Sequence, residues 1–156
     1  MARITKILTI INEIDREIRQ KICWSVKYSE YSGVLFEFGG LIPRTNPIQN
    51  LQFSEQERNN VGAVSLFIQT QWIVISPNQM IIGDHLDGKA LDSFDGVKIS
   101  ALRINPSDLE LRLQSIMGID LVATLADFDD IYHVRIGKDR WSFGPGPEVI
   151  HSVAKL

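Results

Sequence analysis

The chain has 156 residues, of which 44% are hydrophobic and 22% charged, so its composition predicts one globular domain, residues 1–156, and excludes wholesale disorder. The net charge of −3 argues against a nucleic-acid partner, because proteins that bind phosphate backbones usually carry a surplus of basic side chains. No apolar run reaches about 18 residues and no signal-peptide pattern follows the first residues, so we expect no membrane partner and a cytoplasmic location.

Residues 2–22 place apolar side chains three or four positions apart, which predicts one amphipathic helix. The opposite face mixes both signs of charge, so we expect this helix to pack on a sheet rather than lie on a membrane. A homodimer with a structural role, paired through the apolar stripe of residues 4–22, is an alternative. The stripe consists of Ile4, Ile7, Leu8, Ile11, Ile14, Ile18 and Ile22.

Cys23 is the only cysteine of the chain. An internal disulfide is therefore impossible, and a zinc site built on several cysteines is excluded. Its apolar neighbours Ile22 and Trp24 predict a buried thiol without a chemical role. We expect no cofactor and no metal.

After Trp24 the apolar period changes from about 3.6 to 2, which predicts a β-rich region over residues 24–143 followed by a tail, residues 144–156. Polar, proline-broken residues 41–60 predict a long loop, and residues 84–96 a loop or turn. Tight turns separate most of the strands, with one turn expected near Glu30–Gly33. The predicted strands lie within residues 24–38, 61–75, 79–83, 97–105, 108–114, 118–125, 131–136 and 140–143.

One helix and about eight short strands predict an α+β fold. Strands joined by tight turns pair most readily as antiparallel neighbours, so we expect a mostly antiparallel sheet. Such a sheet folds into a barrel or a sandwich, with the N-terminal helix packed against it.

Sequence motifs of common enzyme classes are absent: the chain has no phosphate-binding glycine loop, no nucleophile elbow and no His-Glu-x-x-His pair. An enzymatic alternative nevertheless stays open. His85 and His133 together with the carboxylates of Asp127–Asp130 would suit a metal-dependent hydrolase, provided that these side chains converge.

Acidic side chains concentrate in the middle of the chain, where residues 84–130 carry ten acidic and four basic groups. A fixed cluster of carboxylates attracts a basic partner and accelerates the encounter with it. We therefore predict a negatively charged contact surface for a protein partner. Its candidate residues are Asp84, Asp87, Asp92, Asp95, Asp127, Asp129 and Asp130.

Several short motifs occur in a fixed order along residues 24–143. They are Trp24-Ser25, the strand end Phe36-Glu37-Phe38-Gly39, the run Val61-Gly62-Ala63-Val64-Ser65-Leu66 leading to Gln71-Trp72-Ile73, then Ile82-Gly83-Asp84, the late hairpin with Leu109-Glu110-Leu111-Arg112-Leu113 and Gly118-Ile119-Asp120-Leu121, the acidic turn Asp127–Asp130, and Trp141. In these motifs the chain resembles a family of small uncharacterised bacterial proteins. It departs from that family at Ile73, where the family tends to have arginine.

The resemblance implies a fold rather than an activity, because the shared motifs are structural and the family offers no catalytic residues to carry over. In size and pattern the chain is also similar to immunity proteins of bacterial toxin systems. This similarity implies a non-enzymatic binding protein that neutralises a toxin by occluding its active site. The acidic contact surface would then face a basic cleft of the toxin.

Overall fold

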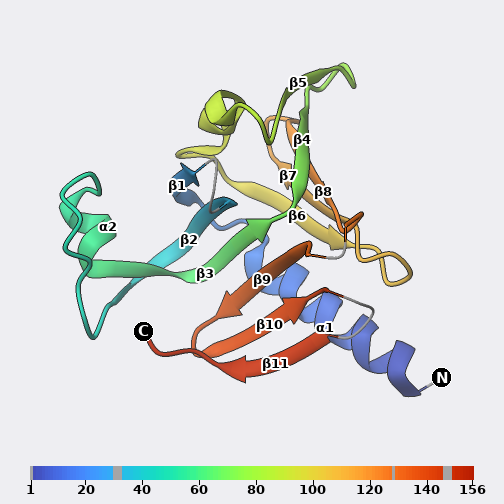
Figure 1. Ribbon diagram of the computed structural model, residues 1–156, viewed down its shortest axis with the longest axis horizontal. Helices are drawn as coiled ribbons and strands as arrows, with labels where there is room; N and C mark the ends of the chain where they lie inside the picture. Colours follow the sequence, from blue (N-terminus) through green and yellow to red (C-terminus); the bar gives the residue numbers. More distant parts are fainter. Residues whose placement is uncertain (1, 30–32, 128, 146–148) are drawn as a thin grey trace.

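The computed structural model describes residues 2–29, 33–127, 129–145 and 149–156, and among these it describes side chains from residue 6 onward. It confirms the predicted α+β class. One N-terminal helix packs against two antiparallel sheets, which form a sandwich-like arrangement rather than a closed barrel (Figure 1). No helix of the described residues is long and apolar enough to cross a membrane.

Three helical segments and two sheets make up this part of the chain. The helical segments are α1 (Ala2–Ile18), α2 (Glu55–Asn59) and the 3-10 helix η1 (Gly88–Phe94). The six-stranded sheet has the order β1 (Cys23–Ser29), β2 (Gly33–Pro43), β3 (Asn60–Gln69), β9 (Ile131–Ile136), β10 (Asp139–Phe143) and β11 (Val149–Val153). The five-stranded sheet has the order β5 (Ile81–Asp84), β4 (Gln71–Ile75), β8 (Asp120–Thr124), β7 (Leu111–Ser115) and β6 (Ile99–Ile104).

Helix α1 confirms the predicted apolar stripe from Ile11 to Ile18, but Leu8 of that stripe is 41% exposed and the helix ends earlier than predicted. Ile11, Ile14 and Ile18 are buried in the core, as expected for a helix laid on a sheet. The helix stops at Ile18 because Gln20 adopts a left-handed backbone conformation with φ of 67°. Ile22 therefore lies outside the helix and is 46% exposed. It forms an isolated antiparallel β-bridge with Lys98, just before β6.

The predicted strand over residues 61–75 is two strands in two sheets. β3 ends at Gln69, β4 begins at Gln71, and the chain crosses between the sheets at Thr70. The Thr70 hydroxyl donates to the carbonyl of Thr124, which fixes the crossing point beside β8. Because the alternation of side chains continues through the crossing, the sequence carries no visible break there.

Three segments that we predicted as loop or tail contain regular structure. Residues 41–60 include the end of β2 and the short helix α2, and residues 84–96 include η1, which buries Leu91 and Phe94. The tail beyond residue 143 forms β11, an edge strand paired with β10. The turn predicted near residues 30–32 lies outside the described residues.

The core fills the space between the two sheets and α1. In strands β2, β3 and β9 of the six-stranded sheet, alternate residues point inward and are fully buried, such as Phe36, Leu66 and Val134. The residues between them point to the outer face of this sheet. That outer face is where polar and charged side chains gather.

Candidate functional site

Polar side chains form a row across the outer face of the six-stranded sheet. The strand register aligns one residue from each strand, so that side chains far apart in sequence become neighbours. This polar row consists of Ser25, Glu37, Ser65, Arg135, Arg140 and Ser152. The parallel row two residues along each strand consists of Lys27, Leu35, Phe67, His133, Ser142 and Ile150.

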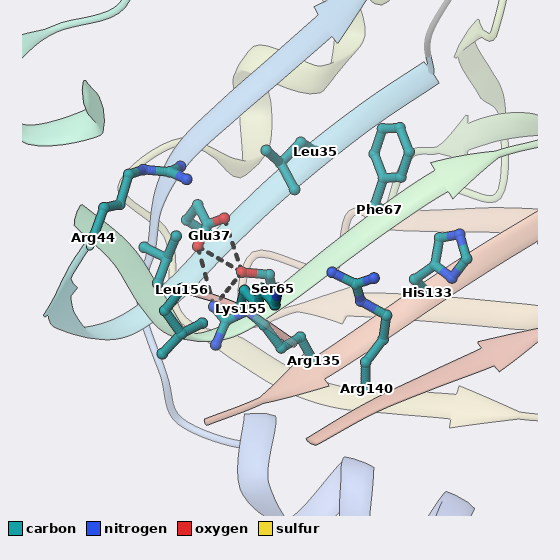
Figure 2. A pocket seen from close by; sticks show the side chains of 11 residues that line it. Leu35, Glu37, Arg44, Ser65, Phe67, His133, Arg135, Arg140, Lys155 and Leu156 are labelled. Atoms are coloured by element: carbon teal, nitrogen blue, oxygen red, sulfur yellow. Dashed lines mark hydrogen bonds and ion pairs between the residues drawn. The ribbon is translucent and has the colours of Figure 1, made fainter. Parts of the chain in front are cut away.

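The central members of the two rows form the floor of a pocket of about 440 Å³, which we call the cationic pocket. They are Glu37, Ser65, Arg135 and Arg140 of the first row and Leu35, Phe67 and His133 of the second. Two further segments supply the walls of the pocket: Arg44 comes from the chain after β2, and Lys155 and Leu156 follow β11 (Figure 2). The backbone N–H of Thr45 donates to the Leu156 carbonyl at 2.9 Å and so ties the two walls together. A cavity of this size accommodates a small organic molecule.

Glu37 lies at the centre of the pocket floor and is only 4% exposed. Its carboxylate accepts hydrogen bonds from the backbone N–H of Gly62 and from the hydroxyl of Ser65. The Ser65 oxygen lies 2.8 Å from one carboxylate oxygen and 2.7 Å from the other. Burial raises the pKa of Glu37, although these hydrogen bonds and the charge of Arg135 act against that rise. Gly62 is required here, because a Cβ at this position would lie 2.5 Å from the Phe38 carbonyl oxygen.

Arg135 is the buried counter-charge of Glu37. One of its terminal nitrogens lies 3.7 Å from the carboxylate and also donates to the carbonyl of Gly62 at 2.6 Å and to Ser65. The other donates to the carbonyl of Gly137 at 2.7 Å. Burial lowers the pKa of Arg135 from its usual value, against the effect of Glu37. The pair is therefore held within the floor by hydrogen bonds on all sides.

Three further cations line the pocket without a carboxylate partner. In the described part of the chain, Arg44, Arg140 and Lys155 form no ion pair. Arg44 is oriented by hydrogen bonds from its Nε to the backbone carbonyls of α2 and β3, at 3.3 and 3.2 Å. Figure 2 shows the guanidinium of Arg140 directed toward the centre of the site. Uncompensated positive charge therefore surrounds a half-enclosed space.

His133 and Phe67 stand side by side at the other end of the floor (Figure 2). Their rings are nearly parallel, with 6.2 Å between centroids, and the His133 Nδ1 lies 2.7 Å from the hydroxyl of Ser142. Burial and then the charge of Arg140 lower the pKa of His133. The imidazole is therefore mostly neutral near pH 7.

Helix α2 anchors the segment that carries Arg44. Ser54 and Glu57 form a capping box at its N-terminus, and the same Glu57 carboxylate accepts the hydroxyl of Ser25 at 2.6 Å and pairs with Lys27 at 3.2 Å. Burial raises the pKa of Glu57, but these hydrogen bonds outweigh it, and the net shift is downward. Glu57 thus attaches the wall of the pocket to strand β1.

The seven aspartates predicted as a contact surface lie in two groups. Asp84, Asp87, Asp92 and Asp95 surround η1, where Asp87 caps the helix. Asp127, Asp129 and Asp130 lie in the connection where the chain passes from β8 to β9. Asp130 is buried, and its carboxylate accepts the backbone N–H of Asp127 at 2.8 Å, which gives it a structural role in that turn.

The two histidines of the enzymatic alternative lie in different parts of the fold. His85 follows β5 in the five-stranded sheet, whereas His133 lies on β9 beside the cationic pocket. Within the residues that the structure describes, no three His, Cys, Asp or Glu side chains come close enough to hold a metal ion. The structure therefore does not bring the proposed ligands together.

The residues of the cationic pocket were not among those predicted from the sequence, apart from His133. A signal for two of them is present in the sequence. Glu37 and Arg135 are charged residues inside otherwise apolar strands, in the runs Leu35–Phe38 and His133–Ile136. A charge in the middle of a strand that is buried on one face indicates either an ion pair or a site on the other face.

Comparison of this chain with protein-family models, with curated proteins and with solved structures found no match.

Proposed function

We propose that this chain is a non-enzymatic binding protein whose ligand presents an anionic group to the cationic pocket. The observation that carries the proposal is the charge of the pocket. Arg44, Arg140 and Lys155 line it without a carboxylate partner in the described structure. Guanidinium groups bind carboxylates and phosphates through paired hydrogen bonds, so an anion is the ligand that this lining favours.

The one acidic side chain among the described lining residues does not cancel this charge. Glu37 already accepts hydrogen bonds from Gly62 and Ser65 and pairs with Arg135. The three remaining cations are left for a ligand. Partial enclosure strengthens their effect, because water screens charges less well in a recess than on an open surface.

The hydrogen bonds of the hydroxyl groups in and beside the pocket support binding rather than catalysis. The hydroxyl of Ser65 is buried against Glu37 and Arg135, so it is not poised as a nucleophile. His133 uses its Nδ1 toward Ser142 on the neighbouring strand. These contacts fix the side chains of the floor in place, as preorganised binding requires.

The toxin-neutralising role suggested by the resemblance remains a proposal about the partner. The cationic pocket has the opposite sign to the acidic contact surface predicted from the sequence. A protein partner that binds at this pocket would present an acidic group rather than a basic cleft. The aspartates around η1 offer a separate surface for a basic partner, and substitutions there distinguish the two modes.

The test is a titration of ¹⁵N-labelled protein with inorganic phosphate, followed by amide chemical shifts. We expect saturable shifts in β2, β3, β9 and β10. Arg140→Gln should weaken the binding of phosphate about tenfold, as expected for the loss of one charged hydrogen-bonding partner. Arg16→Gln is the matched control, because Arg16 is also an exposed arginine without an ion pair in the described structure. Equal affinity in both variants, or shifts that never saturate, would contradict the proposal.

A further inference from the structure

We infer that the anion bound by the cationic pocket also carries an aromatic or branched aliphatic group, which enters a second pocket beside it. This inference rests on the proposed function and specifies its ligand as a small amphipathic organic anion. The second pocket has a volume of about 470 Å³ and lies over β1 and β2. We call it the aromatic pocket, after Phe53 and Phe67, which line it together with Leu35.

The two pockets form one continuous groove because they share a wall. Leu35 and Phe67 line both of them, and the strand register places these two residues opposite each other on β2 and β3. Figure 2 shows both side chains along one side of the site, opposite the charged groups. A molecule bound to the cations would therefore contact an apolar surface on its other side.

The aromatic pocket differs from its neighbour in charge. Among the described residues that line this pocket, only Lys27 carries a positive charge. Its Nζ pairs with the Glu57 carboxylate at 3.2 Å. The Lys27 ammonium also lies 5.3 Å from the ring centroid of Phe53, a geometry that favours cation–π attraction. The groove thus has one end with surplus positive charge and one end whose charge is compensated, where Leu35, Phe53 and Phe67 lie beside the uncharged polar side chains of Ser29, Asn50 and Gln52.

The spacing along β2 sets the length of the ligand. Glu37 lies under the cationic end, Leu35 at the shared wall and Gly33 under the aromatic end. Residues two apart on a strand are roughly 7 Å apart, so the two ends lie about 7–14 Å from each other. An anionic head and a ring joined by a few single bonds span that distance, whereas inorganic phosphate fills one end only.

Three small probes separate the contributions of the two ends. 4-Phenylbutyrate carries both an acid and a ring, butyrate carries the acid without the ring, and 4-phenylbutan-1-ol carries the ring without the acid. We expect 4-phenylbutyrate to bind at least tenfold more tightly than either of the others in amide-shift titrations. Only 4-phenylbutyrate should shift amides of β9, β10 and residues 50–53 together.

Phe53→Ala tests the aromatic pocket alone, because Phe53 lines that pocket and is not part of the cationic lining. We expect it to abolish the advantage of 4-phenylbutyrate over butyrate while phosphate binding, which also reports correct folding, is retained. Leu51→Ala is the matched control: Leu51 belongs to the same segment, is 83% exposed and lines neither pocket. It should leave all four affinities unchanged.

The outcomes distinguish this inference from the proposed function. If phosphate and butyrate bind but 4-phenylbutyrate binds no more tightly, or if Phe53→Ala has no effect, the inference is wrong and the anion site stands. If no anion binds, both are wrong. If 4-phenylbutan-1-ol binds as tightly as 4-phenylbutyrate, the acid group contributes nothing to the binding of this probe and the inference is wrong, whereas phosphate binding alone decides the proposed function.

Discussion

Glu37 and Arg135 are two charged side chains that the fold buries in strands otherwise rich in apolar residues. Removing both charges from water is costly, and their separation of 3.7 Å makes the direct attraction modest. The surrounding hydrogen bonds from Gly62 and Ser65, and to the carbonyl of Gly137, compensate for the lost water. The pair therefore contributes order to the pocket floor more than net stability.

Arg135→Met should lower the free energy of unfolding by about 3 kcal/mol, because it leaves Glu37 buried without a counter-charge. Urea unfolding followed by circular dichroism measures this loss. In the double variant Glu37→Gln/Arg135→Met the loss should be clearly smaller than the sum of the two single losses, since no uncompensated charge remains. Strictly additive losses would show that the two groups are not coupled.

His133 should make stability depend on pH. Its pKa in the folded protein lies below the usual 6.5, so the unfolded chain binds more protons at mildly acidic pH. The free energy of unfolding should therefore fall as pH drops through 6.5, and His133→Gln should lose that part of the fall. Comparing the variant with the wild type isolates His133 from Glu37, whose raised pKa acts in the opposite direction.

The same histidine reports an anion in the pocket. Arg140 is the charged group that disfavours its protonation, and a bound anion would offset that charge. Saturating phosphate should raise the pKa of His133, as read from its ring proton shifts. An unchanged pKa at saturating phosphate would place the anion away from this end of the floor.

Among the elements, the segment between β2 and β3 determines the shape of the groove, because it supplies Arg44 to one pocket and Phe53 to the other. It has few backbone pairings of its own: Arg44 N to Asn59 O at 2.8 Å, and Ile48 N to Arg58 O at 2.9 Å. The Thr45 N–H also donates to the carbonyl of Leu156, and the side chain of Glu57 attaches the segment to β1. This element should therefore be the most sensitive part of the site.

Glu57→Gln should weaken phosphate binding several-fold and lower the free energy of unfolding by about 1–2 kcal/mol, since it removes the charge that holds Ser25 and Lys27. The stability that Glu57 contributes in the wild type should itself be lost as the pH falls through the lowered pKa of this carboxylate. Glu55→Gln, an exposed position in the same first helical turn, is the control and should change neither quantity. Equal behaviour of the two variants would exclude the anchoring role.

Element prediction succeeded where a periodicity belongs to one element, and it failed in residues 61–75, where the same alternation runs through two strands and hides the crossing at Thr70. The stripe of α1 and the alternation in β2 and β9 follow directly from side-chain burial on one face. It also failed where burial needs a distant partner. η1 forms because Leu91 and Phe94 pack into the core, and β11 exists because β10 offers a free edge. Neither partner is visible in the local sequence.

At the scale of the whole molecule, one core joins the two sheets. Buried residues of both sheets and of α1 belong to a single apolar cluster, and the crossing at Thr70 connects the sheets covalently. Neither sheet retains a closed core without the other. The molecule should therefore unfold as one cooperative unit.

Two tryptophans test this cooperativity, because Trp72 lies in the five-stranded sheet and Trp141 in the six-stranded sheet. Because Trp24 also lies in the six-stranded sheet, both variants are made in a Trp24→Phe background, so that each keeps one tryptophan. Fluorescence of Trp24→Phe/Trp72→Phe and of Trp24→Phe/Trp141→Phe should give, for each variant, a urea midpoint that coincides with its own midpoint by circular dichroism. Separate midpoints in either variant would mean that the sheets unfold independently.

The candidate site could not be predicted from the sequence because it is a property of the complete topology. The sequence places its acidic surplus in residues 84–130, and this led to a predicted acidic surface. The cationic pocket instead draws single residues from β2, β3, β9, β10 and the tail. Each cation is isolated along the chain. The register of β2, β3, β9 and β10 makes Arg135 and Arg140 neighbours, and the segments after β2 and β11 bring Arg44 and Lys155 to the same pocket.

The alternation of the six-stranded sheet has a consequence for how such a molecule can change its ligand. Odd-numbered residues such as Leu35, Glu37, Ser65 and Phe67 contact the groove, while their even-numbered neighbours hold the core together. Exchanges at groove-facing positions such as Leu35 and Phe67 therefore leave the core side chains in place, whereas Glu37 and Ser65 are tied into the buried network around Arg135. Exchange of single groove-facing side chains can therefore change which ligand binds, while the fold stays the same.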